Sequence, residues 1–319
     1  MAVLVLLCAT RAEAGEARRY VFGSGVDPSG PYQVIAEAKG FFAKHGVHVT
    51  VKKFSSATAA FRALQAGEID AAVPGTLTPV SALAQGASNF RIVGSTRLTQ
   101  NKFSAAVVDK TISKPQDLVG KKVAMAQGSP SSHLWFENYA RYHKLDGVQR
   151  IWLQPQEQLI AFSKGEVDAI FIWRPWYTKA LEVRPGSRIL AYDADIGHVN
   201  DTPITFSTKL MEDRESAKAI LRALIDADEF LAANRKEGAE IIGKAFNISA
   251  AETLEILDTV GLKVQLSDAT FKDLCDNTRF LRETGKLQSA PNWKQAVVPD
   301  LLREEAPARV NYTKFIECQ

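Results

Sequence analysis

Three short turns rich in glycine, serine and threonine combine hydroxyl groups with the start of a helix. They cover residues 27–32, 74–78 and 128–133, and each precedes a stretch with helical spacing. Backbone N–H groups at a helix start, together with the positive end of the helix dipole, form an anion-binding site. Each turn taken alone is better explained by a serine or threonine that caps its own helix. Because three such turns occupy equivalent places in the chain, we favour ligand binding over capping.

The sequence Ile-Trp-Arg-Pro-Trp at residues 172–176 follows a predicted buried strand and supplies a second group of candidates. Trp173 can form a wall of a ligand site, and Arg174 can pair with an anionic head group. The alternative is that Trp173 belongs to the core and Arg174 is a solvated surface residue, and Trp176 fits a core position. Consecutive strand residues point to opposite faces, so Trp173 and Arg174 face one cleft only if the strand has already ended.

Sequence motifs that mark common active sites are absent from the chain. It has no G-x-x-x-x-G-K-[ST] phosphate loop, no H-E-x-x-H zinc motif and no G-x-S-x-G nucleophile turn. A dinucleotide-binding fingerprint that starts at Gly23 fails, because Pro28 stands where the third glycine is needed. The five histidines and the cysteines lack metal-binding spacing. We therefore expect a binding protein and not an enzyme, with no cofactor and no metal ion.

The predicted elements place these turns at the ends of strands in two similar units. Residues 19–94 alternate between strand and helix, and residues 122–171 repeat that alternation. Gly-Glu-Ile-Asp-Ala at residues 67–71 returns as Gly-Glu-Val-Asp-Ala at residues 165–169. This order predicts an α/β fold with mostly parallel sheets flanked by helices. In such sheets ligands bind beyond the carboxyl ends of the strands.

Two such units joined by extended crossovers predict two lobes with a cleft between them. The crossovers are expected at residues 103–108 and 202–207. The predicted division assigns residues 104–206 to lobe 2, and residues 15–103 and 207–319 to lobe 1. After residue 207 the spacing is helical, so we expect a C-terminal helical extension packed on lobe 1, with Trp293 as the anchor of the tail.

The composition and the two ends of the chain indicate a secreted monomer. The 319 residues carry a net charge of +3 without a dense basic run, so nothing favours nucleic-acid binding. An apolar run followed by Ala-Glu-Ala predicts a signal peptide over residues 1–14 and export to the periplasm. Its removal also removes Cys8 and leaves Cys275 and Cys318. These two either pair in an oxidising compartment or remain free thiols.

Four segments in a fixed order carry a family resemblance. They read AEAKGFFAKHGVHV (36–49), LQAGEIDAA (64–72), DLVGKKVAMAQGSPSSH (117–133) and GEVDAIFIWRPW (165–176). With them the chain resembles the periplasmic substrate-binding proteins of ABC importers for sulfonates, taurine, nitrate and pyrimidine precursors of thiamine. The resemblance implies a two-lobed, type II-like binding protein that closes on its ligand and docks on the membrane permease of the importer. The ligand-binding residues predicted by position are Ser29, Gly30, Tyr32, Gly75, Thr76, Leu77, Ser129, Ser131, Ser132, His133 and Trp173, to which the oxyanion argument adds Arg174.

One departure from the family bears on the ligand. Taurine-type members often have Trp-Asp-Pro where this chain has Trp-Arg-Pro at residues 173–175, and an aspartate suits an ammonium group. Arg174 therefore argues against taurine and favours a sulfonate-like oxyanion, held mainly by the turn at residues 128–133. Two alternatives stay open: a neutral heterocycle such as a thiamine pyrimidine precursor stacked on Trp173, and a desulfinase-like enzyme on the same fold. That enzyme needs a nucleophilic cysteine in the cleft, whereas the two cysteines of the mature chain lie in its C-terminal part.

Overall fold

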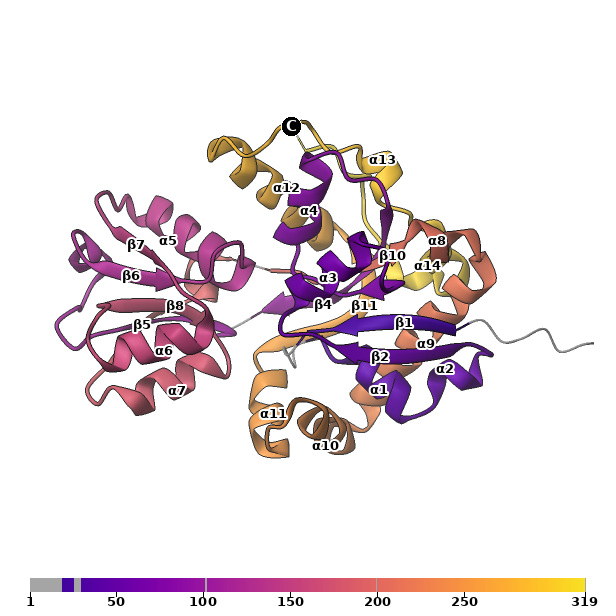
Figure 1. The fold of residues 1–319 in the computed structure, drawn as a ribbon, viewed down its shortest axis with the longest axis horizontal. Helices are drawn as coiled ribbons and strands as arrows, with labels where there is room; N and C mark the ends of the chain where they lie inside the picture. Colours follow the sequence, from indigo (N-terminus) through magenta and orange to yellow (C-terminus); the bar gives the residue numbers. More distant parts are fainter. Residues whose placement is uncertain (1–18, 26–29, 101, 199, 319) are drawn as a thin grey trace, which may run out of the picture.

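The computed structural model describes residues 19–25, 30–100, 102–198 and 200–318, apart from the side chains of residues 97–100. The chain forms two lobes, each built around one β-sheet with helices on its faces (Figure 1). The predicted two-lobed α/β fold is therefore confirmed. The predicted signal peptide lies outside the described residues. Within the described part of the chain, no helix is both long and apolar enough to cross a membrane.

The larger lobe contains a seven-stranded sheet in the order β12-β11-β4-β10-β3-β1-β2. Its strands are β1 (Arg19–Ser24), β2 (His48–Lys53), β3 (Ala71–Ala72), β4 (Phe90–Gln100), β10 (Pro203–Ser207), β11 (Val260–Ser267) and β12 (Val310–Asn311). Its helices are α1 (Tyr32–Ala38), α2 (Phe41–Lys44), α3 (Ala57–Gln65), α4 (Leu77–Ala84), α8 (Thr208–Glu212), α9 (Arg214–Ala233), α10 (Arg235–Phe246), α11 (Ala250–Leu257), α12 (Asp268–Glu283), α13 (Trp293–Ala296), α14 (Asp300–Glu305) and the short η4 (Pro307–Arg309).

The smaller lobe contains a five-stranded sheet in the order β7-β6-β8-β5-β9. Its strands are β5 (Ser104–Val108), β6 (Lys122–Met125), β7 (Gln149–Trp152), β8 (Ala169–Trp173) and β9 (Arg188–Tyr192). Its helices are α5 (Trp135–His143), α6 (Pro155–Ser163), α7 (Trp176–Val183) and the short turns η1 (Pro115–Leu118), η2 (Pro130–Leu134) and η3 (Asp193–Ile196).

Both sheets are mixed, which corrects the expectation of mostly parallel strands. In the larger sheet β1 runs parallel to β2 and β3, whereas β10 runs antiparallel to β3 and β4. In the smaller sheet β6 runs parallel to β7 and β8, whereas β5 runs antiparallel to β8 and β9. Strands β5 and β10 each follow a crossing between the lobes and enter their sheet from the side that faces the other lobe. The strands of the α/β units have their carboxyl ends on that same side. Strands β5 and β10 start there and are therefore antiparallel to them.

The two crossings lie slightly before the predicted ones. The chain passes from β4 to β5 in the first crossing and from β9 to β10 in the second. The segments expected to be crossovers, residues 103–108 and 202–207, are mostly β5 and β10 themselves. Because β10 pairs with β3 and β4, residues 203–206 belong to the seven-stranded sheet and not to lobe 2. The other boundaries of the two predicted lobes stay a prediction.

The repeated Gly-Glu-x-Asp-Ala unit has the same structural role in both lobes. Gly67 and Gly165 follow helices α3 and α6 with positive φ angles of 77° and 72°, which glycine adopts without strain. The carboxylate of Asp70 then accepts a backbone N–H bond of 2.9 Å from β1, and that of Asp168 accepts one of 2.8 Å from β6. Each carboxylate thus joins a short buried strand to its parallel neighbour. The repeat marks the fold and not the ligand site.

The C-terminal part of the chain is not wholly helical, which corrects a second expectation. Helix α11 ends at Leu257, and β11 follows as a strand paired with β4. The sequence of β11, Val-Gly-Leu-Lys-Val-Gln-Leu-Ser, alternates apolar and other residues, so the signal for a strand was present. Cys275 and Cys318 form a disulfide, which decides between the two alternatives left open. Trp293 is buried and anchors the tail in the core, as predicted.

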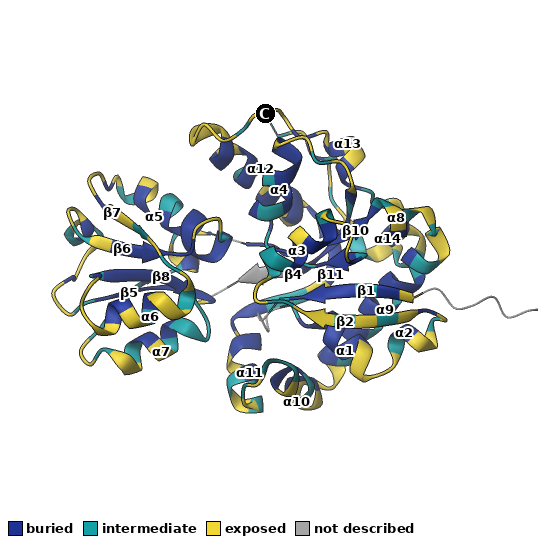
Figure 2. Cartoon of the chain, viewed as in Figure 1, coloured by how far each residue is buried: buried dark blue, intermediate teal, exposed yellow. Residues whose placement is uncertain are grey.

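Buried side chains follow both sheets and the helix faces turned toward them (Figure 2). In the larger lobe they form one continuous apolar cluster. In the smaller lobe they form two clusters, because alternate residues of β5, β6 and β8 point to opposite faces of the sheet. The smaller sheet is therefore a middle layer with a core on each side.

Candidate functional site

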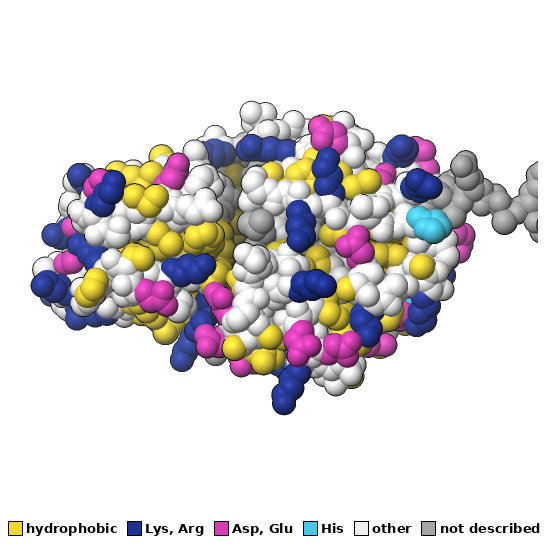
Figure 3. Space-filling model, turned by 60° about the horizontal axis from the view of Figure 1, so that its bottom comes forward, with side chains coloured by type: hydrophobic (Ala, Val, Ile, Leu, Met, Phe, Trp, Pro, Cys, Tyr) yellow, Lys and Arg dark blue, Asp and Glu magenta, His cyan; other side chains and the backbone are white. Residues whose placement is uncertain are grey.

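The predicted ligand turns of the two lobes meet where the lobes touch. A Cβ atom placed on Gly75 of the larger lobe would lie 3.0 Å from Cγ of Pro130 in the smaller lobe. A side chain at position 75 would therefore press against the opposite lobe. The surface is hollowed along the line where the lobes meet (Figure 3). The structure thus brings together the turns at residues 74–78 and 128–133, which are far apart in the sequence.

In the turn of the smaller lobe, the three serines have different partners. The hydroxyl of Ser132 accepts a hydrogen bond of 2.8 Å from the N–H of Ala126 and donates to the carbonyl of Phe171. It therefore joins the end of β6 to the middle of β8 and is fully buried. The hydroxyl of Ser131 accepts a bond of 2.7 Å from Asn200 in the second crossing. Ser129 is half-buried and precedes η2.

The turn of the larger lobe is fastened to the second crossing. The N–H and the hydroxyl of Thr76 both donate to the carbonyl of Asp201, at 3.3 and 2.9 Å. Thr76 is fully buried, and Leu77 packs in the core of the larger lobe. At this turn a ligand would therefore meet the backbone around Gly75 and not these two side chains.

The first predicted turn contributes less than expected. Ser29 lies outside the described residues, and Gly30 is half-buried. The hydroxyl of Tyr32 donates to Asp228 at 2.7 Å, deep in the larger lobe. Burial, helped by the neighbouring Asp228 carboxylate, holds the pKa of the Tyr32 phenol well above its usual value. Tyr32 therefore ties α1 to α9, and its side chain does not line the cleft.

Trp173 and Arg174 stand at the end of β8 and just past it, and both meet residues of the larger lobe or of the first crossing. Strand β8 ends at Trp173, so the condition for both side chains to face the other lobe is met. Trp173 packs against a cluster formed by Phe103 of the first crossing with Ile256 and Val260 of the larger lobe. The guanidinium of Arg174 forms an ion pair of 3.0 Å with Glu255 on α11. The guanidinium of Arg174, which was expected to pair with the ligand, therefore pairs with a carboxylate of the same chain.

His133 contacts aromatic side chains from both lobes. Its ring lies edge-on to Trp152 at 4.7 Å and to Phe280 of α12 at 5.3 Å between centroids. Burial lowers the pKa of His133 to about 4, so the ring is neutral near pH 7. Its Nδ1 accepts a hydrogen bond from the N–H of Gly128. The ring thus serves as an apolar contact between the lobes, with two partners that sequence reasoning did not select.

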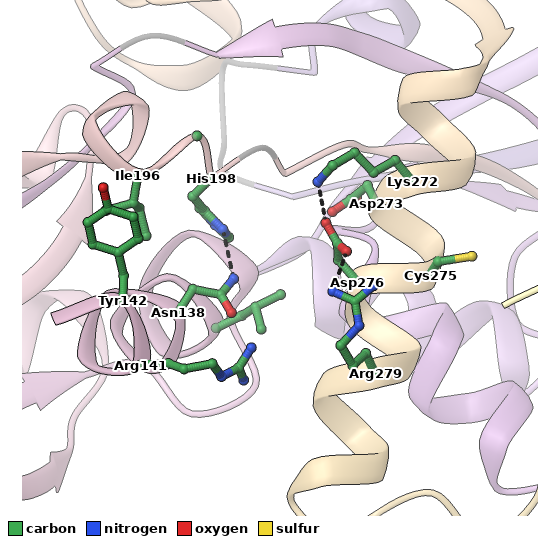
Figure 4. A pocket seen from close by; sticks show the side chains of 12 residues that line it. Asn138, Arg141, Tyr142, Ile196, His198, Lys272, Asp273, Cys275, Asp276 and Arg279 are labelled. Carbon is green, nitrogen blue, oxygen red and sulfur yellow. Dashed lines mark hydrogen bonds and ion pairs between the residues drawn. The ribbon is translucent and has the colours of Figure 1, made fainter. Parts of the chain in front are cut away.

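A cavity of about 440 Å³ lies between α5 of the smaller lobe and α12 of the larger one (Figure 4). His198 of the second crossing donates to the carbonyl of Pro130 at 3.1 Å and pairs with Asn138 at 3.2 Å. Burial lowers the pKa of His198 to about 4. On the opposite wall, Asp276 is paired with both Lys272 and Arg279.

Buried beside this cavity is a second carboxyl group. Asp273 accepts the N–H of Asp201 at 3.0 Å and the side-chain amide of Asn277 at 3.0 Å. Burial, followed by repulsion from Asp201, raises the pKa of Asp273 to about 7. None of the predicted ligand residues lines this cavity. Its walls come from two helices and a crossing that are distant in sequence, so no local pattern could reveal it.

Comparison with known proteins places the chain in a family. A model of the NMT1-like family matches residues 28–243. The chain belongs to the NMT1-like family. The taurine-binding periplasmic protein of Escherichia coli (strain K12) is 26% identical to this NMT1-like chain over 276 residues, which cover 81% of this chain and 85% of that protein. The resemblance inferred from the four sequence segments is thereby confirmed.

Solved structures share the fold of this NMT1-like protein. The alkanesulfonate-binding protein SsuA from Xanthomonas axonopodis pv. citri, bound to MOPS, superimposes with a TM-score of 0.75 at 23% identity, covering 90% of this chain and 100% of that one. A mutant of DSZB in complex with biphenyl-2-sulfinic acid superimposes with a TM-score of 0.68 at 15% identity, covering 91% and 99% of the two chains. At these identities the likeness concerns the fold alone.

Proposed function

We propose that this protein is the periplasmic substrate-binding component of an ABC importer and captures a small organic oxyanion of the sulfonate type between its lobes. It acts as a monomer and delivers the ligand to a membrane permease. The observation that carries the proposal is the meeting of two helix-opening turns from different lobes at Gly75 and Pro130. The relative named for taurine binding supports the class of ligand.

The chemistry of the two turns supports an anion. Helix α4 begins just after Gly75, and the helical segment formed by η2 and α5 begins at Pro130. Helix N-termini favour negative charge by about 0.3–1 kcal/mol at exposed sites and up to about 2 kcal/mol when partly buried. A hydrogen bond to a charged group adds about 1.5–3 kcal/mol. Within the turns, the half-buried Ser129 and the hydroxyl of Ser131 are the polar side chains placed to reach such a ligand.

A neutral heterocycle is the second candidate ligand, favoured by one observation. Trp173 is half-buried and ends β8 at the contact between the lobes, where a flat ring could stack on its indole. The desulfinase-like alternative receives less support, because Cys275 and Cys318 are disulfide-bonded. Among the described residues neither sulfur is therefore free as a thiolate nucleophile.

Calorimetric titration tests the proposal and separates these candidates. Methanesulfonate, taurine, nitrate and a neutral aminopyrimidine are titrated into the purified protein at low and high salt. We expect a sulfonate to bind with an affinity that falls as salt rises. Salt-independent binding of the aminopyrimidine alone would favour the heterocycle, and release of sulfite over several turnovers would make the protein an enzyme.

A pair of variants then tests the location of the ligand. Gly75→Ala places a methyl group against Pro130, so we expect the affinity for the bound sulfonate to fall about tenfold, or about 1.4 kcal/mol. Ser163→Ala, on the exposed face of α6 in the smaller lobe, is the control and should bind like the parent. Equal affinities for Gly75→Ala and the parent would remove this turn from the site.

A further inference from the structure

Two ion pairs between described residues join the lobes, and they lie at opposite edges of the contact. Arg174, just past β8, pairs with Glu255 of α11 at 3.0 Å. Arg141 of α5 pairs with Glu283 at the end of α12 at 2.5 Å. Figure 1 places α11 below and α12 above the junction of the lobes. Each pair takes its arginine from the smaller lobe and its glutamate from the larger one.

Each edge also carries an aromatic contact between the lobes. Beside the first ion pair, Trp173 packs against the cluster of Phe103, Ile256 and Val260, the last two from the larger lobe. His133 packs against Phe280 on the same helix as the second pair. The two edges are therefore built alike, with one apolar contact and one ion pair each. Because the pairs lie at opposite edges, a movement that parts the lobes at either edge would break the ion pair of that edge.

Exposure sets the strength of these pairs. The side chains of Arg174 and Glu255 are 21% and 64% exposed, and those of Arg141 and Glu283 are 50% and 43% exposed. Pairs exposed to this extent are screened by water and salt, and each shifts an equilibrium by up to about fivefold. Such pairs are too weak to hold the lobes shut by themselves. They are strong enough to set how often the lobes close without a ligand.

We propose that Arg174–Glu255 and Arg141–Glu283 form a two-sided electrostatic latch that favours the closed arrangement of the lobes. In this assignment Arg174 acts on closure, and its charge is not the main partner of the ligand. The latch makes closing depend on ionic strength even when no ligand is present. The measurement of ligand affinity rests on the binding function proposed above. The scattering measurements of the unliganded protein do not.

The radius of gyration of the unliganded protein, measured by small-angle X-ray scattering at about 50 and about 500 mM salt, tests the latch without a ligand. We expect a smaller radius for the parent at low salt than at high salt. Glu255→Gln and Glu283→Gln should each enlarge the radius at low salt and lower the closing constant about two- to fivefold. Joining Arg174→Glu with Glu255→Arg should restore the compact form that either single reversal loses.

A matched control uses an ion pair within one lobe. Arg184 and Asp109 pair at 2.7 Å inside the smaller lobe, with side chains 20% and 17% exposed. Asp109→Asn should lower the melting temperature and leave the radius unchanged. If both glutamine variants keep the parent radius at low salt, the latch does not exist. If only one of them enlarges it, the latch is one-sided and the two-sided proposal fails.

The affinity for methanesulfonate separates the latch from direct ligand binding by Arg174. A latch predicts that Glu255→Gln weakens methanesulfonate binding, because the closed form becomes rarer. If Arg174 instead holds the anion, Glu255 competes with it, and Glu255→Gln should tighten binding. Tighter binding would overturn the proposal. If methanesulfonate does not bind the parent, the proposed ligand class fails, while the scattering measurements still decide on the latch.

Discussion

In the smaller lobe the helix-opening turn is bonded both to strands of its own sheet and to the second crossing, whereas in the larger lobe Thr76 bonds its turn to that crossing. Ser132 joins its turn to the end of β6 and the middle of β8, so this turn is held to the smaller sheet. Thr76 joins its turn to Asp201, which is in turn bonded to Asp273 of α12. The smaller-lobe turn is also bonded to the second crossing, through Ser131 and Pro130, so a hinge movement there acts on both turns, and the strand bonds of Ser132 oppose it in the smaller lobe.

The lobes also differ in how they are held together. The larger lobe carries the Cys275–Cys318 disulfide, whereas the smaller lobe depends on the packing of two cores about its sheet. Four of the five tryptophans lie in the smaller lobe, at residues 135, 152, 173 and 176. Intrinsic fluorescence therefore reports mainly on the smaller lobe, while circular dichroism reports on both. Unfolding followed by both methods therefore distinguishes the smaller lobe from the whole molecule.

The largest expected effect comes from removing the disulfide of the larger lobe. The two cysteines are 43 positions apart, and closing a loop of this length stabilises the folded state by about 4 kcal/mol in the chain-entropy model. We expect Cys275→Ser with Cys318→Ser to lower the urea midpoint seen by circular dichroism more than the midpoint seen by fluorescence. Cys318→Ser alone should reproduce the loss. A double variant within about 1 kcal/mol of the parent would show that the tail is held by packing alone.

The next largest effect is a loss of stability in the smaller lobe and not in the larger one. Ser132→Ala leaves the buried N–H of Ala126 and the carbonyl of Phe171 without their hydroxyl partner, which costs about 1–3 kcal/mol. We expect the fluorescence midpoint in urea to fall. Ser131→Ala is the control, since its hydroxyl bonds to the crossing and joins no strands. Equal losses in both variants would mean that Ser132 does not hold its turn to the sheet.

The smallest expected effect is a dependence on pH. The raised pKa of Asp273, about 7, means that the folded state binds a proton that the unfolded state releases near pH 4. This contribution is full below that unfolded value and is lost as the pH rises through about 7. It should remove about 1 kcal/mol of stability between about pH 6 and about pH 7.5.

His133 and His198 act in the opposite direction, so a difference measurement is needed. Their lowered pKa values, about 4, mean that their contribution is present above about pH 6.5 and is lost as the pH falls. Urea unfolding of the parent and of Asp273→Asn at several pH values isolates the carboxyl group. We expect stability to rise more steeply with pH in Asp273→Asn than in the parent. Parallel curves would show that Asp273 is ionised in the folded protein.

Sequence reasoning predicted part of the candidate site and missed the rest for one reason. It selected the turns at residues 74–78 and 128–133 because each combines turn residues with a helix start, which is a local signal. It did not select Phe280 or Glu255, because each meets its partner only across the lobes, nor Trp152, which meets His133 from another element of the same lobe. Tyr32 was selected by position, yet its hydroxyl is directed to Asp228, 196 positions away.

Local signals in the sequence were enough to define the two α/β units and the places where their helices stop. The Gly-Glu-x-Asp-Ala repeat suffices for this, since a glycine with positive φ ends each helix and an aspartate joins the next strand to its neighbour. Only the tertiary structure decided the direction of β5 and β10, the insertion of β11 beside β4 and the pairing of Arg174 with Glu255. Conformations within a few residues follow from local sterics and hydrogen bonds, whereas contacts between distant segments depend on how the whole chain closes.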